Sequence, residues 1–522
     1  MKRCPQCGKI YSDLIMQCPT CKTNMIKFQD TQDPIKFQDT QDLIKFQDTQ
    51  GDQNTQNISS QQLFEGKQKL DLKYLTEEIQ PLVEAMNHIS SILMEQLTSQ
   101  KENVFISSYS IVITLMLLSH CSESGEHIEQ LKNFLGIKDL SEEKILSAQK
   151  QLTMLLGANQ SYDKCILKTA NAIYIDKEMN LTPAFNKLSD IFLKNYQAAL
   201  GVYTLSAEST KNEINGWVRD QTNGLINSIL SQPFDNTTQM ALLNAIYFKA
   251  SWEKKFSKYT EEKIFHGQNG DTIVDMMNNE ASFLYAETKC YQMIRLPYYG
   301  DYEMVVYLPK NAIDIMNWHY PNEAEIKNPH WQKRTVSLHM PKFELEYKKN
   351  LKNVLQALGL NGIFEDNYYD RLATDLLKAG IVIHKTMIKN DQKGSEAAAV
   401  TMVSMAVTSA PRPAKVEKVK EMNIDHPFYF IISNTKTKLK LFEGCIYNLG
   451  RKVEKAQLEN IIANDKRIKE LIEERRKSIE QEEKEKREKE RRKDAKRKFK
   501  RCITQCIAWI VIIIFAMILY RC

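Results

Sequence analysis

Four cysteines near the N-terminus have the residue type and spacing of metal ligands. They form two Cys-x-x-Cys pairs, Cys4 with Cys7 and Cys18 with Cys21, and ten residues separate the pairs. Four thiolates carried on two such turns can close a tetrahedron around Zn²⁺. A segment this short has no other means of forming a core, so metal binding would stabilise its fold. We therefore expect structural zinc as the cofactor of residues 1–25, with two disulfides as the alternative and no open position for catalysis.

A second segment with unusual chemistry lies between residues 397 and 410. It contains no charged residue, no proline and no glycine, and small or apolar side chains occupy every second position from Ser395 to Val407. Such a segment can enter the middle of a sheet, because it buries one row of side chains without burying a charge. Prolines at 411 and 413 and a charged stretch at 415–421 follow it. These neighbours belong outside a core, which argues against an ordinary buried strand.

Two stretches of different composition follow the cysteine pairs. A nine-residue unit that begins IKFQDTQ repeats three times from Ile26 to Asp52. One apolar pair per nine residues buries too little surface to offset chain entropy, so we expect residues 26–66 to be a low-complexity linker. Residues 70–450 alternate amphipathic helical segments with β-rich runs, which predicts a large α+β body.

The segment that follows the body differs from it in charge. Residues 451–501 contain 21 basic and 13 acidic side chains and Arg521 adds one positive charge, so residues 1–450 carry −3 although the whole chain carries +6. A slightly acidic body is not expected to bind nucleic acid. The composition of 451–501 predicts a charged, solvated helical stalk. A weak heptad spacing of isoleucines within 458–479 leaves a coiled coil open.

Residues 503–520 are apolar apart from Thr504 and Gln505, and a strongly basic stretch precedes them. A helix of this length extends about 27 Å, which is enough for a thin bilayer core. The segment therefore predicts a transmembrane tail anchor, with a buried core helix as the alternative. The positive-inside rule would then place the body in the cytosol, attached to the endoplasmic reticulum or another organelle surface.

Eight sequence blocks in the body occur in the order and at about the spacing of the serpin family, so residues 75–450 resemble a serpin. The N-terminal cysteine pairs resemble a zinc ribbon. The resemblance implies a serpin fold with three β-sheets, eight or nine helices, an exposed reactive loop and a metastable native state. The eight blocks are Asn103–Ser110, Ile214–Gly224, Leu243–Lys249 with Trp252, Leu296–Tyr298, Met340–Phe343, His384–Lys385, Gly394–Ala399 and Asp425–Phe428.

The resemblance also implies a mechanism in which the chain is not an enzyme. In serpins a protease attacks the reactive loop, forms an acyl-enzyme, and is carried across the molecule as the loop inserts into the main sheet. Catalysis belongs to the nucleophile of the target. The sequence agrees, because it contains no nucleophile elbow, no Gly-rich phosphate loop and no HExxH helix. We expect no catalytic residues in this chain.

The position of the reactive bond depends on how the loop is counted. Fourteen residues from Ser395 place the bond between Thr408 and Ser409. The loop is about eight residues longer than is usual in the family, and counting back from His426 places the bond near Val416. A neutral Thr408 would suit an elastase-like protease or a papain-like cysteine protease. Lys415 or Arg412 would suit a trypsin-like protease, although Pro413 makes Arg412 the poorest candidate.

The resemblance further assigns residues to the hinge of the loop and to polar groups under the main sheet. Gln392 and Lys393 depart from the family because acidic residues are usual there, and Ser108 and Ala250 replace a usual proline and a usual glycine. The assigned hinge residues are Gly394, Ser395, Glu396, Ala397, Ala398 and Ala399. The assigned shutter residues are Ser107, Ser110, Asn244 and His384, and the breach residue is Trp252.

These features lead to two hypotheses about function. The first is a tail-anchored inhibitor of a serine or papain-like cysteine protease that traps the acyl-enzyme by loop insertion. The second is a non-inhibitory serpin that serves as a membrane-anchored platform for protein interactions, with a docking protein at its zinc ribbon.

Overall fold

The computed structural model describes residues 2–3, 10–11, 26–27, 72–158, 164–310, 321, 329–395, 419–452 and 455–519. The chain separates into two compact units, Met1–Leu70 and Asp71–Cys522. The described parts of the first unit are three short strands, and the second unit contains all other helices and strands of the described residues.

The first unit contains a small antiparallel sheet. Strand β1 (Lys2–Arg3) lies between β2 (Ile10–Tyr11) and β3 (Ile26–Lys27). Arg3, which directly precedes Cys4, pairs with both Ile10 and Ile26. The sheet therefore joins positions on the N-terminal and C-terminal sides of the two Cys-x-x-Cys pairs.

A six-stranded sheet is the central element of the second unit, and its strand order is β13-β16-β17-β7-β5-β6. Strands β7 and β16 are parallel and pair directly from Met240 with Ala379 to Tyr247 with Met387. Strand β17 lies between them only beyond this stretch. The strands are β5 (Cys165–Asp176), β6 (Ala199–Tyr203), β7 (Met240–Ser251), β13 (Phe343–Asn350), β16 (Ala379–Asn390) and β17 (Gly394–Ser395).

A nine-stranded sheet contains most of the remaining strands, in the order β18-β12-β9-β10-β11-β19-β20-β4 with β8 beside β9. Strands β19 and β20 are buried along almost their whole length, as expected of strands that are covered on both faces. The strands are β4 (Val104–Ile106), β8 (Thr260–Gly267), β9 (Gly270–Glu287), β10 (Tyr291–Tyr298), β11 (Tyr302–Pro309), β12 (Gln332–Pro341), β18 (Lys420–Asn423), β19 (Phe428–Asn434) and β20 (Lys440–Ile446). A two-stranded sheet joins β14 (Asn367–Tyr368) and β15 (Leu376–Leu377).

Seven α-helices and three shorter 3₁₀ or π segments accompany these three sheets between residues 72 and 452. This inventory of the described residues agrees with the predicted α+β class and serpin fold. The shorter segments are Thr98–Gln100, Phe192–Tyr196 and Gly362–Phe364. The helices are α2 (Leu72–Leu97), α3 (Ser108–Ser119), α4 (Glu126–Phe134), α5 (Glu142–Ala158), α6 (Phe185–Ile191), α7 (Glu208–Gln221) and α9 (Lys352–Ala357).

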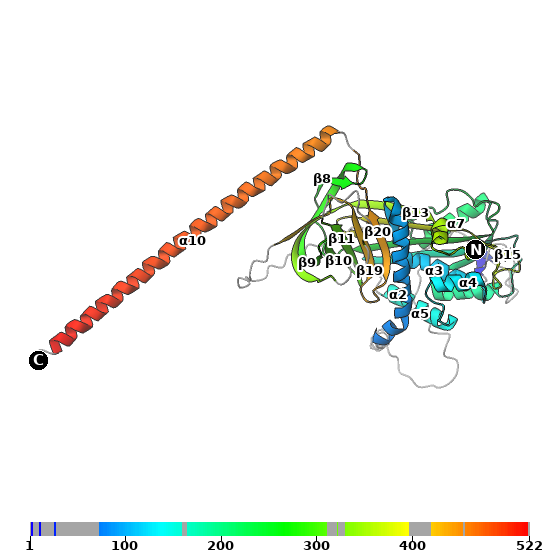
Figure 1. Cartoon of the computed structure of the whole chain (residues 1–522), viewed down its shortest axis with the longest axis horizontal. Coiled ribbons are helices and arrows are strands. Elements are labelled where there is room, and N and C mark those ends of the chain that lie inside the picture. Colours follow the sequence, from blue (N-terminus) through cyan, green and yellow to red (C-terminus); the bar gives the residue numbers. More distant parts are fainter. Residues whose placement is uncertain are drawn as a thin grey trace. The chain divides into compact units, whose positions relative to one another are not determined.

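Helix α3 lies at the centre of the main core. It packs against β5 and β7 of the six-stranded sheet and against β20 of the nine-stranded sheet. Helix α2 packs in turn on α3, α5 and β20 (Figure 1). Every residue of α3 is buried. A helix that is covered on all sides can be apolar all round, which explains the run Ile111–Leu118.

Helix α7 covers the six-stranded sheet through a second, smaller cluster of buried residues. Ile214 and Val218 of α7 contribute to this cluster. The sheet contributes small side chains together with Tyr174 and Leu243 from β5 and β7, and Ile383 from β16. The small residues are Ala170, Ala172, Ala241 and Ala245.

A single helix, α10 (Lys455–Leu519), covers most of the predicted stalk and most of the predicted anchor. Its described apolar side chains include Ile507, Trp509 and Ile510, all of which are exposed. Within the part of the chain that the structure describes, no helix is long and apolar enough to cross a membrane. The tail anchor at 503–520 is therefore not confirmed. Its side chains beyond Ile514 lie outside the described residues.

Candidate functional site

Three polar side chains form one row across the centre of the six-stranded sheet. Asn171 on β5 pairs in register with Asn244 on β7, which pairs with His384 on β16. All three side chains are buried. Polar groups at this depth require hydrogen-bond partners, and the first turn of α3 supplies them.

The hydrogen bonds of His384 determine its tautomer. The backbone N–H of Ser107 donates to Nε2 of His384 at 3.1 Å. Because a backbone N–H can only donate, Nε2 carries no proton, and Nδ1–H donates to Oδ1 of Asn244. Burial lowers the pKa of His384 to about 3, and a proton on Nε2 would also break the bond from Ser107. His384 is therefore neutral at physiological pH.

The same polar group fixes the start of α3 to the sheet. Ser107 caps the helix, because its Oγ accepts from the N–H of Ser110 at 3.3 Å. Ser110 donates through Oγ to Oδ1 of Asn171 at 3.2 Å. Nδ2 of Asn244 donates to the carbonyl oxygen of Ser110 at 2.8 Å. The structure thus brings Ser107, Ser110, Asn244 and His384 together and adds Asn171, which the sequence did not single out.

Ser108, which stands where the family usually has proline, belongs to a second buried network. Its Oγ donates to Oγ of Ser90 at 2.6 Å, and Ser90 donates in turn to the carboxylate of Glu443. The hydroxyl of Tyr429 also donates to Glu443. Nζ of Lys440 lies 3.6 Å from the same carboxylate, which is fully buried. The substitution at 108 therefore adds a hydroxyl that helps to connect α2, α3 and β20.

A tight turn at the end of β16 leads into β17. The N–H of Asp391 donates to the carbonyl of Gly394 at 2.9 Å, and the carboxylate of Asp391 accepts from the N–H of Lys393 at 2.8 Å. Ser395 then pairs with Asn390 of β16 on one side and with Ala250 of β7 on the other. Both pairings are antiparallel. The chain thus turns back and begins a new strand between β16 and β7.

Aromatic side chains hold this short strand in place. The rings of Trp252 and Tyr298 stack with their centroids 4.1 Å apart. Nε1–H of Trp252 donates to the carbonyl of Asp391 at 3.1 Å, and the hydroxyl oxygens of Tyr298 and Ser395 are 2.7 Å apart. Burial raises the pKa of Tyr298 well above its ordinary value, so the hydroxyl keeps its proton. Tyr298 is a second residue whose specific role the sequence did not indicate.

One buried group at this point is not satisfied. Asn390 is fully buried, and neither the nitrogen nor the oxygen of its side-chain amide has a hydrogen-bond partner among the described residues. Replacement by an apolar residue of similar shape would remove that penalty.

The remaining predicted site residues lie outside the described residues, including every cysteine of the predicted zinc ribbon. Within the described parts of the chain, no group of three or more His, Cys, Asp or Glu side chains could hold a metal ion. The predicted residues that the structure does not describe are Glu396, Ala397, Ala398, Ala399, Thr408, Ser409, Arg412, Lys415, Val416, Cys4, Cys7, Cys18 and Cys21.

Comparisons with known proteins agree with this geometry. Residues 84–449 match the family model described as serpin (serine protease inhibitor). Iripin-1 of Ixodes ricinus is 32% identical over 379 residues, which cover 70% of this chain and 94% of that protein. Leukocyte elastase inhibitor of Xenopus tropicalis is 32% identical over 388 residues, which cover 70% and 98%. The native crystal structure of a thermophilic serpin, tengpin, aligns with a TM-score of 0.60 and 27% identity, covering 73% of this chain and 95% of that one.

Proposed function

Because the chain belongs to the serpin family, whose members are mostly protease inhibitors and are not enzymes in the usual sense, we propose that it inhibits a protease by inserting its cleaved loop into the six-stranded sheet. The observation that carries the proposal is strand β17. This strand already occupies the place between β7 and β16 that an inserting loop would fill, and it runs antiparallel to both neighbours.

Extension of β17 would exchange one ladder of hydrogen bonds for two. The direct parallel pairing of β7 with β16 would be lost, and two antiparallel pairings would replace it. Antiparallel pairs are somewhat more stable per residue than parallel ones. The uncharged run 397–410 could fill this position, because alternate side chains from Ser395 to Val407 are small or apolar. Insertion is therefore favourable once the loop is free to move.

Cleavage of the reactive bond would free the loop to move into the sheet. The nucleophile of the target protease attacks the carbonyl carbon at the reactive bond, the acyl-enzyme forms, and the amine of the next residue leaves with the proton delivered by the protease. The acyl-linked end then moves with the inserting loop. The row Asn171–Asn244–His384 opposes premature opening, because separation of β7 from β16 breaks the bond between Asn244 and His384.

The class of target follows from the residue at the reactive bond. We favour Thr408–Ser409, which suits an elastase-like or papain-like protease, and a relative that bears the name leukocyte elastase inhibitor supports an elastase-like target. Cleavage after Lys415, Arg412 or Val416 remains the alternative for this long loop. Mass spectrometry of the fragment released on protease challenge would identify the bond.

The experiment that tests inhibition uses the alternation along the loop, in which every second side chain would be buried on insertion. The full chain is mixed with elastase-like, trypsin-like and papain-like proteases, and complexes that survive denaturing electrophoresis are counted. Thr401→Arg places a charge in the row that would be buried, whereas Thr401→Val changes the same side chain without adding a charge. We expect Thr401→Arg to be cleaved without trapping the protease and Thr401→Val to retain trapping.

The results also separate inhibition from the alternative function. If the wild-type chain is cleaved by these proteases, forms no complex and gains no thermal stability, loop insertion does not occur. A membrane-anchored interaction platform would then be the better description.

We make a separate proposal for each end of the chain. We propose that Cys4, Cys7, Cys18 and Cys21 hold structural zinc, and the antiparallel sheet β2-β1-β3 supports this because it joins the chain on either side of both cysteine pairs. Elemental analysis should find one zinc per chain, and substitution of Cys4 and Cys7 by serine should abolish it.

We also propose that the apolar end of α10 attaches the body to a membrane from the cytosolic side. The sequence of 503–520 and the exposed apolar side chains up to Ile514 support this. Removal of 503–522 should release the protein from the membrane fraction, and unchanged fractionation would contradict the proposal.

A further inference from the structure

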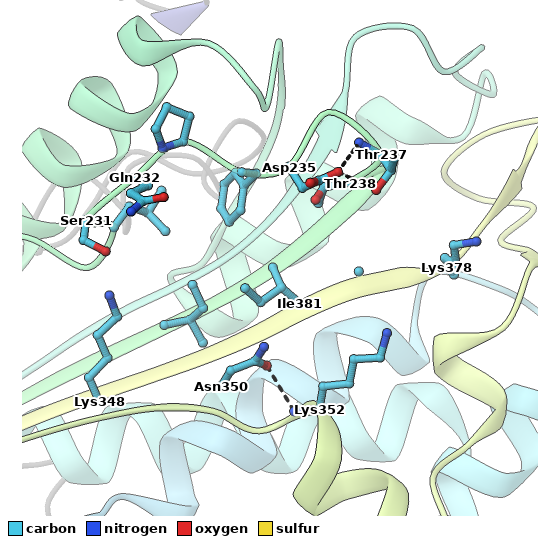
Figure 2. A pocket seen from close by; sticks show the side chains of 15 residues that line it. Ser231, Gln232, Asp235, Thr237, Thr238, Lys348, Asn350, Lys352, Lys378 and Ile381 are labelled. Carbon is cyan, nitrogen blue, oxygen red and sulfur yellow. Dashed lines mark hydrogen bonds between the residues drawn. The ribbon is translucent and has the colours of Figure 1, made fainter.

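A cavity of about 490 Å³ lies on the face of the six-stranded sheet (Figure 2). One wall is the segment 230–238, which connects α7 to β7. The other wall is formed by β16 with the residue before it and by the end of β13 with the start of α9. Its volume falls within the range of about 300–1,000 Å³ that is typical of small-molecule sites.

The floor of the cavity is apolar. Phe234 belongs to the first wall, and Ile381 and Ile383 belong to β16. Ile381 is only half-buried, although its neighbour Val382 is buried. The cavity therefore leaves apolar surface of the sheet uncovered at this point.

The rim of the cavity is mainly basic. Lys348, Lys352 and Lys378 line it, whereas Asp235 is its one acidic lining residue among those described. Lys378 is already paired with Asp366 at 3.1 Å, but no described carboxylate lies within ion-pair distance of Lys348 or Lys352. Figure 2 shows these two side chains rising from the wall opposite Ser231 and Asp235. Burial and the neighbouring Lys385 lower the pKa of Lys348, although the carboxylate of Glu346 acts in the opposite direction.

We propose that this cavity binds a small amphipathic anion, such as a medium-chain carboxylate. Its apolar body would lie on Phe234, Ile381 and Ile383, and its carboxylate would bind a lysine of the rim, either Lys348 or Lys352. An apolar floor with a few charged groups at the rim is the usual composition of a ligand site.

The position of the cavity gives the ligand a regulatory role, which rests on the proposed function. One wall leads directly into β7 and the other includes β16, and these are the two strands that must separate for insertion. A ligand that contacts both walls binds the closed sheet more tightly than the open one. By linkage it stabilises the closed sheet to the same extent. Occupancy should therefore slow loop insertion.

Calorimetry on the full chain tests the site, with decanoate as the probe and octan-1-ol as a neutral amphiphile. We expect saturable binding of decanoate by the wild-type chain, and affinity at least tenfold lower in the double variant Lys348→Gln, Lys352→Gln. Lys333→Gln is the matched control, because Lys333 is exposed on β12 of the other sheet. We expect this variant to bind like the wild type. Absence of saturable binding, or equal affinity in the double variant, would overturn the site.

The regulatory role has its own measurement. The rate at which a trapped protease complex forms is measured with and without saturating decanoate, in the wild type and in the double variant. We expect at least a threefold slower rate in the wild type only. An unchanged rate in the wild type, with binding established, would overturn the regulation. If no protease is trapped under any condition, the proposed function fails and the regulation with it, while calorimetry still decides whether the site exists.

Discussion

The neutral state of His384 makes a quantitative prediction about stability and pH. Burial lowers the pKa of this side chain to about 3 in the folded chain, whereas an exposed histidine has a pKa near 6.5. Between these two values the unfolded chain binds more protons than the folded chain. The free energy of unfolding must therefore fall as the pH decreases below about 6.5.

The size of the effect follows from the same two values. Each pH unit within the window removes about 1.4 kcal/mol, so His384 should account for a loss of about 2 kcal/mol between about pH 7 and about pH 5. The contribution of His384 to the free energy of unfolding is complete above the pKa that the side chain has in the unfolded chain. It is lost progressively as the pH falls toward the pKa of the folded chain.

The variant His384→Gln isolates this contribution, since glutamine can accept from Ser107 and donate to Asn244 without titrating. We expect the variant to be less stable than the wild type at neutral pH, because its hydrogen bonds are less well placed. Urea unfolding is followed by tryptophan fluorescence across this pH range for both chains. The difference in unfolding free energy should shrink by about 2 kcal/mol as the pH falls to about 5. Parallel pH profiles would refute the inference that a buried, neutral histidine holds the sheet closed.

Three further substitutions test the point where the loop enters the sheet. Asn390→Leu should raise the free energy of unfolding by about 1–3 kcal/mol, because it removes a buried amide without partners; a lower urea midpoint would contradict this. Gly394→Val should expel β17 and increase the ratio of cleaved to trapped chains on protease challenge, since a Cβ at Gly394 would lie 2.1 Å from the carbonyl oxygen of Ala250. Trp252→Phe should lower stability by about 1 kcal/mol through loss of the hydrogen bond to Asp391, and an unchanged thermal midpoint would show that this bond contributes nothing.

The sequence predicted those parts of the site that depend on local pattern or on family blocks. The serpin fold is confirmed, and the residues assigned to the shutter lie in one hydrogen-bonded group. Asn171 could not be predicted, because its role depends on the register of β5 against β7, and register is a property of paired strands. Tyr298 was visible as part of a block, but its contact with Ser395 joins residues 97 positions apart in the chain.

The cavity beside β16 was not predictable for a similar reason. Its lysines come from β13, from α9 and from the residue before β16, and only the folded sheet brings them near Phe234. No spacing of residues in the sequence marks such a site. The departure at Ser108 was visible in the sequence, but its partner Ser90 depends on the packing of α2 against α3.

The alanines beneath α7 have a mechanical consequence. Ala170 and Ala172 of β5, with Ala241 and Ala245 of β7, present only methyl groups to the helix. The larger members of the same surface are Leu243 of β7 and Tyr174 of β5, and the Tyr174 ring lies edge-on to Trp217 of α7 with their centroids 6.2 Å apart. Movement of β5 beneath α7 would therefore pass over methyl groups at the alanines, and the contact between Tyr174 and Trp217 is the aromatic contact that it would have to break. Larger residues at the four alanine positions would add contacts of the same kind and would hinder movement of the sheet beneath α7.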